Sequence, residues 1–169
     1  HNPFSGRGLP ANDIDCFAED STGNLYIGTN GNGLIYYDRK RETFRVFRAH
    51  PAHPDSLGHD VIVSLLYDTK GRLWIGTYYG GLNVYDGKTF TRYTHQEDDP
   101  GSLADNRVWK ILEDRQGRIW IGTLGGGLDL WDSEKERFLH HRSGDINSVR
   151  SDFILTLYED NSGKLWIGT

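Results

Sequence analysis

The chain has 169 residues, of which 36% are hydrophobic, and its formal net charge is -5. This acidic balance argues against a nucleic-acid or anionic-membrane partner held by bulk electrostatics. The single cysteine, Cys16, rules out a disulfide within the chain, and no apolar stretch reaches the roughly 18 residues of a membrane span. Any targeting segment or membrane anchor is therefore expected outside this sequence.

A ten-residue sequence that begins with Asp and ends with Gly-Thr occurs four times, over residues 20–29, 68–77, 114–123 and 160–169. The glycines of the closing pair are spaced by 48, 46 and 46 residues. A period of this length is typical of the four-stranded blade of a β-propeller and too long for a short solenoid repeat. The repetition predicts that the chain is built from copies of one structural unit.

The third copy shows the predicted strands of that unit most clearly. Residues 107–113 and 118–123 are rich in aliphatic, β-branched and aromatic residues and predict two strands. An Asp and a Gly between them favour a tight turn, because Asp can hydrogen-bond to the backbone ahead of it and Gly accepts a positive φ. Residues 128–132 and 137–141 predict two further strands. The short connections favour an antiparallel meander.

Two positions in each copy indicate how the sheets pack. In the first strand, Ile14 and Phe17 are three positions apart, which suggests a β-bulge or burial on both faces. In the second strand each copy has an aromatic residue between aliphatic neighbours, namely Tyr26, Trp74, Trp120 and Trp166. Burying one such Trp is worth about 2 to 3 kcal/mol, so the sheets are expected to stack around an axis. The Gly before each Thr indicates that another backbone comes close.

The predicted fold class is therefore all-β, a β-propeller with four-stranded antiparallel blades. The chain would contain three complete blades and half of a fourth, as a fragment of a larger propeller. Residues 1–12, with Phe4, are assigned to the end of a preceding blade or a lead-in. The blades are expected at residues 13–59, 60–105 and 106–151, and residues 152–169 supply the first two strands of the next.

The motif Leu/Ile-Trp-Ile-Gly-Thr, followed by Gly-Gly-Leu and an aromatic-Asp pair, resembles the two-component regulator propeller repeat. The motif is complete at residues 73–86 and 119–132, its first part recurs at 165–169, and the first copy is looser. The WD40 repeat has a similar period, but only Trp131-Asp132 matches its dipeptide and the Gly-His partner is missing.

The resemblance implies a propeller with seven blades, in the periplasmic sensor region of a hybrid two-component histidine kinase. Proteins that the repeat resembles often belong to glycan-degrading gut bacteria and sense oligosaccharides. We therefore expect a non-catalytic sensory segment that responds to an oligosaccharide. The receptor would form a homodimer and reach the membrane only through segments outside this chain. The alternative is a protein-interaction or dimerisation propeller that binds no ligand directly.

In such a meander, the loops between blades and the loops after each Gly-Thr pair lie on one face of the propeller. Both sets of loops vary from copy to copy, so this face is the predicted binding face. The candidate ligand-binding residues are Asn30, Asn32, Tyr78, Tyr79, Arg107, Trp109 and Arg150. The two tyrosines could stack on a sugar ring or pack against the next blade. Trp109 and the tyrosines would be interface anchors under the interaction alternative.

The two arginines could bind a sulfate or carboxylate group of an acidic glycan. Pairing with the nearby Asp105 and Asp152 is the other possibility. Asp60, Asn106 and Asp152 share one position in successive copies and are expected to cap the incoming loops.

No catalytic, metal or cofactor site is predicted. The histidines share no repeated spacing, and the turn aspartates lack the additional alternating oxygen ligands that calcium requires. The first-strand residues expected nearest the axis form no recognisable acid-base pair; they are Cys16, Ser64, Lys110 and Thr156.

Overall fold

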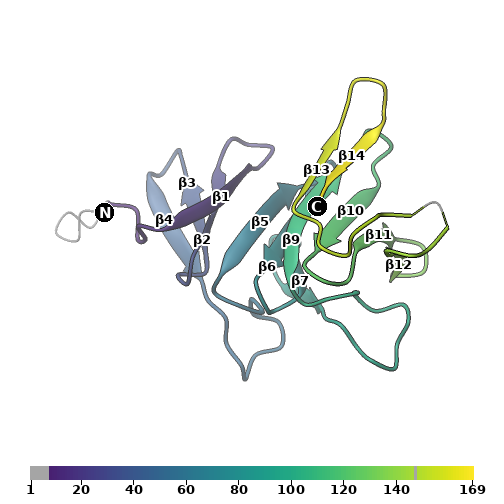
Figure 1. Cartoon of the computed structure of the whole chain (residues 1–169). Coiled ribbons are helices and arrows are strands. Elements are labelled where there is room, and N and C mark those ends of the chain that lie inside the picture. The colour runs from purple at the N-terminus through teal and green to yellow at the C-terminus, as the bar shows by residue number, and fades with distance from the viewer. Residues whose placement is uncertain (1–7, 147) are drawn as a thin grey trace.

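The computed structural model describes residues 8–146 and 148–169, and every regular element within them is a β-strand (Figure 1). The first sheet consists of β1 (Ile14–Glu19), β2 (Leu25–Thr29), β3 (Leu34–Asp38) and β4 (Thr43–Phe47). The second consists of β5 (Ile62–Tyr67), β6 (Leu73–Thr77), β7 (Leu82–Tyr85) and β8 (Phe90–Tyr93). The third consists of β9 (Val108–Glu113), β10 (Ile119–Thr123), β11 (Leu128–Asp132) and β12 (Arg137–His141). A hairpin of β13 (Thr156–Glu159) and β14 (Leu165–Gly168) follows.

Strands pair antiparallel in chain order within each sheet, so each unit is the predicted meander. In the third copy, β11 and β12 have the predicted bounds, while β9 and β10 begin one residue later than predicted. The all-β propeller fold is therefore confirmed. The prediction for Phe4 lies outside the described residues. None of the described residues belongs to a helix long and apolar enough to cross a membrane.

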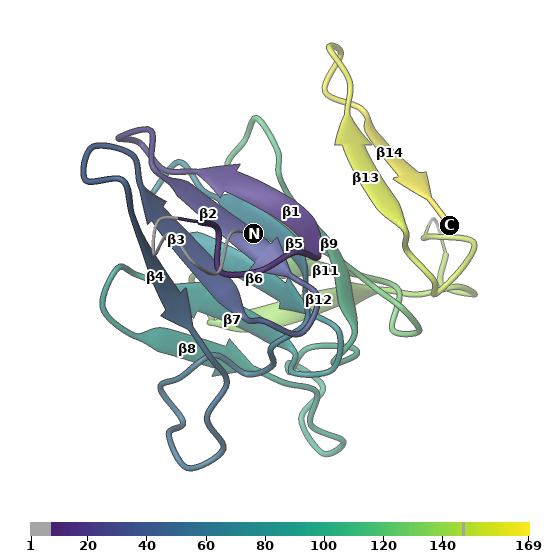
Figure 2. The same cartoon turned by 90° about the vertical axis from the view of Figure 1, so that its left-hand side faces the viewer.

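The sheets lie side by side with their first strands innermost (Figure 1). Strand β1 lies against β5, β5 against β9, and β9 against β13. Figure 2 shows the β13–β14 hairpin projecting to one side of the three sheets. The first strands thus surround an axis, as in a propeller.

The hydrophobic core lies between neighbouring sheets. Trp74 of β6 is 1% exposed, and its ring centroid is 6.0 Å from that of Trp131 in the third sheet. Tyr26 of β2 meets Tyr85 of the second sheet in the same way, with 6.5 Å between centroids. These aromatic residues are buried only because another sheet covers them. Stacking, as the aromatic positions predicted, is therefore the main source of hydrophobic stabilisation.

The turn between the first two strands explains why Asp and Trp recur together. In the second sheet, Asp68 Oδ1 accepts hydrogen bonds from the backbone N–H of Lys70 and Arg72, at 3.0 and 2.8 Å. Its Oδ2 accepts from Trp74 Nε1 at 2.8 Å. Burial alone would raise the pKa of Asp68, but these hydrogen bonds outweigh it and the pKa lies below its ordinary value. Gly71 supplies the positive φ of 80° that the turn needs.

The glycine before each Thr lies where neighbouring sheets come closest. A Cβ atom on Gly76 would be 2.9 Å from both the carbonyl O and Cγ1 of Val108 in β9. Such a contact is too short for a real carbon atom, so the position requires glycine. This confirms the predicted close approach of another backbone.

Candidate ligand-binding site

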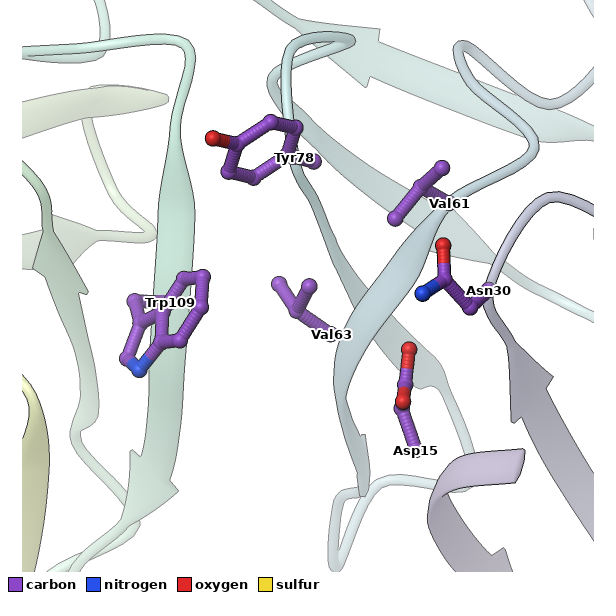
Figure 3. Close-up of a pocket in the computed structure, with 6 residues that line it drawn as sticks. All are labelled: Asp15, Asn30, Val61, Val63, Tyr78 and Trp109. Carbon is purple, nitrogen blue, oxygen red and sulfur yellow. The ribbon is translucent and has the colours of Figure 1, made fainter. Parts of the chain in front are cut away.

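A β-bulge interrupts the first strand of each four-stranded sheet at the same position. The bulged residues are Asp15 in β1, Val63 in β5 and Trp109 in β9. A bulge inserts one extra residue, so it shifts which side chains point toward the axis. All three side chains line one hollow between the first strands (Figure 3). The bulge suggested by the sequence is present, and it positions the site.

The residues just after the bulge face the neighbouring sheet and not the axis. The Sγ of Cys16 lies 3.8 Å from the carbonyl O of Ile62, to which the thiol donates. The Oγ of Ser64 accepts a hydrogen bond from Ile111 N at 3.2 Å. Burial raises the pKa of the Cys16 thiol to about 12. The expectation that Cys16 and Ser64 lie nearest the axis is therefore wrong, because it ignored the extra residue in the strand.

A second pair of side chains, Asn30 and Tyr78, reaches the hollow from the loops after the first two Gly-Thr pairs. The first loop residue of successive blades is Asn30, Tyr78 or Leu124, and each is held at the start of a first strand. The N–H of Asn30 donates to Asp13 O at 3.0 Å, and the N–H of Tyr78 donates to Val61 O at 3.2 Å. The loop residue and the bulged residue therefore occupy fixed positions, while their chemistry differs from blade to blade.

The hollow has a volume of about 560 Å³ and is lined by Asp15, Asn30, Val61, Val63, Tyr78 and Trp109. Figure 3 shows Asp15 and Asn30 together on one wall and Trp109 across from them, on β9. The ring centroids of Tyr78 and Trp109 are 6.4 Å apart, with 62° between the ring planes. The hollow thus has a polar wall and an aromatic wall.

The structure gathers only part of the predicted binding set around this hollow. Asn30, Tyr78 and Trp109 line it. Tyr79 lies beside it, edge-on to Tyr78 with 4.4 Å between centroids, and is 58% exposed. Asn32 does not line the hollow, and its Oδ1 accepts a hydrogen bond from Arg48 Nη2 at 3.0 Å.

Neither predicted arginine lines the hollow. Arg107 is held by Asp105: its Nε is 2.9 Å and its backbone N–H 2.7 Å from Asp105 Oδ1. The hydrogen bond with this carboxylate raises the pKa of the guanidinium. Arg150 is exposed, and the carboxylate of Asp152 binds Ser143 N at 2.7 Å. Of the two predicted ion pairs, the one with Asp105 is present, whereas Asp152 is engaged by the serine.

The predicted loop caps are confirmed. Asp60 Oδ1 accepts from Ala49 N at 2.8 Å, and Asn106 Oδ1 accepts from His95 N at 2.8 Å. Asp152 binds Ser143 in the same manner. Each cap holds the chain where it enters a new blade, close to the binding face.

Sequence reasoning missed Asp15, Val61 and Val63 as lining residues. A signal was available, since Asp15 and Val63 occupy the position of Trp109 in the earlier copies. Within residues 8–146 and 148–169, no three His, Cys, Asp or Glu side chains come together in a way that could hold a metal ion.

The fold and the hollow define a set of propeller blades with a variable face around the axis. The model of the two component regulator propeller matches the chain at residues 8–31, 56–79, 102–125 and 148–169, which is more than half of its length. The chain therefore belongs to the two component regulator propeller family. No curated protein matches it.

Solved structures show the same fold. The extracellular domain attributed to the hybrid two component system BT3049 from B. thetaiotaomicron is 24% identical, with a TM-score of 0.81. The match covers 100% of this chain and 23% of that domain, so the chain spans about a quarter of its length. The corresponding domain of BT4673 from the same organism is 22% identical, over 92% of this chain and 27% of its own, with a TM-score of 0.53.

An enzyme shares the architecture as well. Virginiamycin B lyase from Staphylococcus aureus is 14% identical, over 94% of this chain and 50% of its own, with a TM-score of 0.68. At this identity the likeness concerns the fold alone, since one fold can carry unrelated functions.

Proposed function

We propose that this chain is part of the periplasmic sensory propeller of a hybrid two-component receptor, and that its axial hollow binds an oligosaccharide without catalysis. The family and the extracellular two-component domains of similar fold support the sensory role. The observation that carries the ligand class is the polar wall of Asp15 and Asn30 facing the aromatic wall of Tyr78 and Trp109.

A sugar ring matches these two walls. Its C–H face is apolar and packs on aromatic rings, while its hydroxyls need donors and acceptors at the rim. Trp109 and Tyr78 offer ring surface, and Asn30 and Asp15 offer an amide and a carboxylate. The volume of about 560 Å³ falls within the roughly 300 to 1,000 Å³ that is typical of small-molecule sites.

The hollow also offers a route from binding to signalling. Its lining comes from the first, second and third sheets, which meet at their first strands. A ligand that contacts all of them favours one relative position of the blades over others. In a homodimeric receptor, such a preference biases the equilibrium between two signalling states.

Calorimetric titration of the full ectodomain with an oligosaccharide panel tests this proposal. Trp109→Ala and Tyr78→Ala should each weaken binding by about tenfold or more. Leu139→Ala is the matched control, because Leu139 is 40% exposed on the outer strand β12 and does not line the hollow. No binding across a broad panel would contradict direct recognition.

A second function follows from the exposed pair of Tyr78 and Tyr79, which suits a protein interface. Here the propeller would mediate dimerisation or docking without a ligand of its own. The double variant Tyr78→Ala/Tyr79→Ala separates the two functions in an ultracentrifugation experiment. Loss of self-association with unchanged saccharide affinity would favour the interface.

A further inference from the structure

Among the described residues that line the axial hollow, Asp15 is the only one with a formal charge at neutral pH. We infer that the hollow selects uncharged saccharides over those that carry a carboxylate or sulfate, and that Asp15 makes this selection. The inference rests on the proposed function, because it specifies the saccharide that the hollow accepts.

The Asp15 carboxylate is available to a ligand. Within the described part of the chain it has no side-chain hydrogen bond and no ion pair, and the residue is exposed. Figure 3 shows its oxygens on the same wall as the Asn30 amide. A free carboxylate accepts two hydrogen bonds from neighbouring sugar hydroxyls, whereas it repels an anionic group brought to the same place.

Arg107 and Arg48 already have carboxylate partners. Arg107, at the start of the third blade, has its own counterion in Asp105, with 2.9 Å between Nε and Oδ1. Arg48 on the first blade donates to Gly31 O and Asn32 Oδ1, both at 3.0 Å, and lies 3.6 Å from Asp60. Lys110 follows Trp109 in β9 and is not among the lining residues. Of the two arginines that the sequence suggested for acidic glycans, Arg107 is paired with Asp105, and the exposed Arg150 does not line the hollow.

The repeat itself shows that this position can vary. Val63, Trp109 and Leu155 correspond to Asp15 in the other copies. The bulged residue is not packed between sheets, so the fold imposes no side-chain type on it. The blade fold therefore does not require a charged residue at this position, and the charge of Asp15 affects only what the hollow can bind.

The test compares saccharides that have the same linkage and differ in charge. β-1,4-linked mannotriose is paired with β-1,4-linked trimannuronate, and each neutral member of a broader panel with its uronate, in calorimetry on the full ectodomain. For the wild type we expect the neutral member to bind at least about fivefold more tightly. Raising the salt concentration should reduce this preference, because the carboxylate is exposed to solvent and its field is screened.

Asp15→Asn should remove most of the preference by strengthening uronate binding about fivefold, while neutral binding stays within about threefold. Asp13→Asn is the matched control, because it makes the same charge change two residues earlier, is exposed and lies outside the lining. It should leave the preference unchanged. Tighter or equal binding of the uronate by the wild type, or an equal effect of both variants, overturns the inference and leaves the proposed function standing. If no neutral or acidic saccharide binds, the proposed function itself fails, and the inference fails with it.

Discussion

The Nδ1 atom of His140 lies 2.6 Å from Oδ1 of Asp129, whose side chain is fully buried. The other carboxylate oxygen accepts the N–H of Ala104 at 2.9 Å, and His140 Nε2 lies 2.9 Å from the carbonyl O of Pro100. The pair thus ties the loop that enters the third blade to that blade's outer strands. Both ring nitrogens face acceptors, so only the protonated imidazolium can donate to both.

The second blade makes the same attachment with groups that do not titrate near neutral pH. Asn83, at the position of Asp129, accepts the N–H of Gly58 at 2.8 Å. Arg92, at the position of His140, donates to Ser56 O at 3.1 Å. The third blade therefore has a version of this attachment that depends on a histidine proton.

The histidine predicts a pH dependence of stability. The hydrogen bond with Asp129 raises the pKa of His140 above its ordinary 6.5. A group whose pKa is raised by folding contributes stability that is complete below pH 6.5 and is lost as the pH rises through the folded-state pKa. We expect the free energy of unfolding, measured in urea, to fall between pH 6 and 9 in the wild type.

Two variants test whether the His140–Asp129 pair causes this pH dependence of stability. His140→Gln should lower the stability at pH 6 by about 2 kcal/mol and flatten its pH dependence. Asp129→Asn should also flatten it while keeping the loop attached, as Asn83 does in the second blade. His53→Gln, in an exposed loop, is the control and should retain the wild-type slope. A wild-type slope in both His140 and Asp129 variants would show that other groups cause the dependence.

Within this 169-residue chain, the Trp–Asp hydrogen bond should matter far more where a neighbouring sheet buries the indole than where the indole is exposed. Trp74→Phe removes the 2.8 Å bond to Asp68 and some packing against Trp131, and should cost about 2 kcal/mol. Trp166→Phe removes the same bond, at 2.7 Å to Asp160, from a residue that is 56% exposed. Its cost should be about 0.5 kcal/mol or less. Equal losses in chemical denaturation would mean that the turn, and not the stacking, is the source of stability.

The glycine before Thr in the second strand of each copy allows a similar comparison between a position at a sheet interface and one within a hairpin. Gly76→Ala brings a methyl group within 2.9 Å of the Val108 backbone in the next sheet and should cost about 1 to 3 kcal/mol. Gly168→Ala meets only Thr156 Cγ2 at such short range, at 2.6 Å, within its own hairpin. Since a threonine side chain can move, we expect a clearly smaller loss of thermal stability. A Gly76 variant as stable as the wild type would contradict the close packing of the sheets.

Much of the candidate site could be anticipated from the repeat, and the exceptions have a common cause. Asn30 and Tyr78 could be predicted from the sequence because they lie in loops that vary between the copies on one face. Asp15 was not recognised, although the spacing of Ile14 and Phe17 in the first strand suggests a bulge. The side chain that a bulge turns toward the axis is known only once the bulged residue is located.

The sequence by itself determined the strands, the meander and the Asp–Trp turns, because each of them depends on residues that lie close together in the chain. The period of the repeat likewise determined that the sheets would stack, since their aromatic faces cannot remain in water. Only the tertiary structure decided which side chains meet at the axis. Those relations join different blades or depend on one extra residue in a strand, and neither is visible in local sequence order.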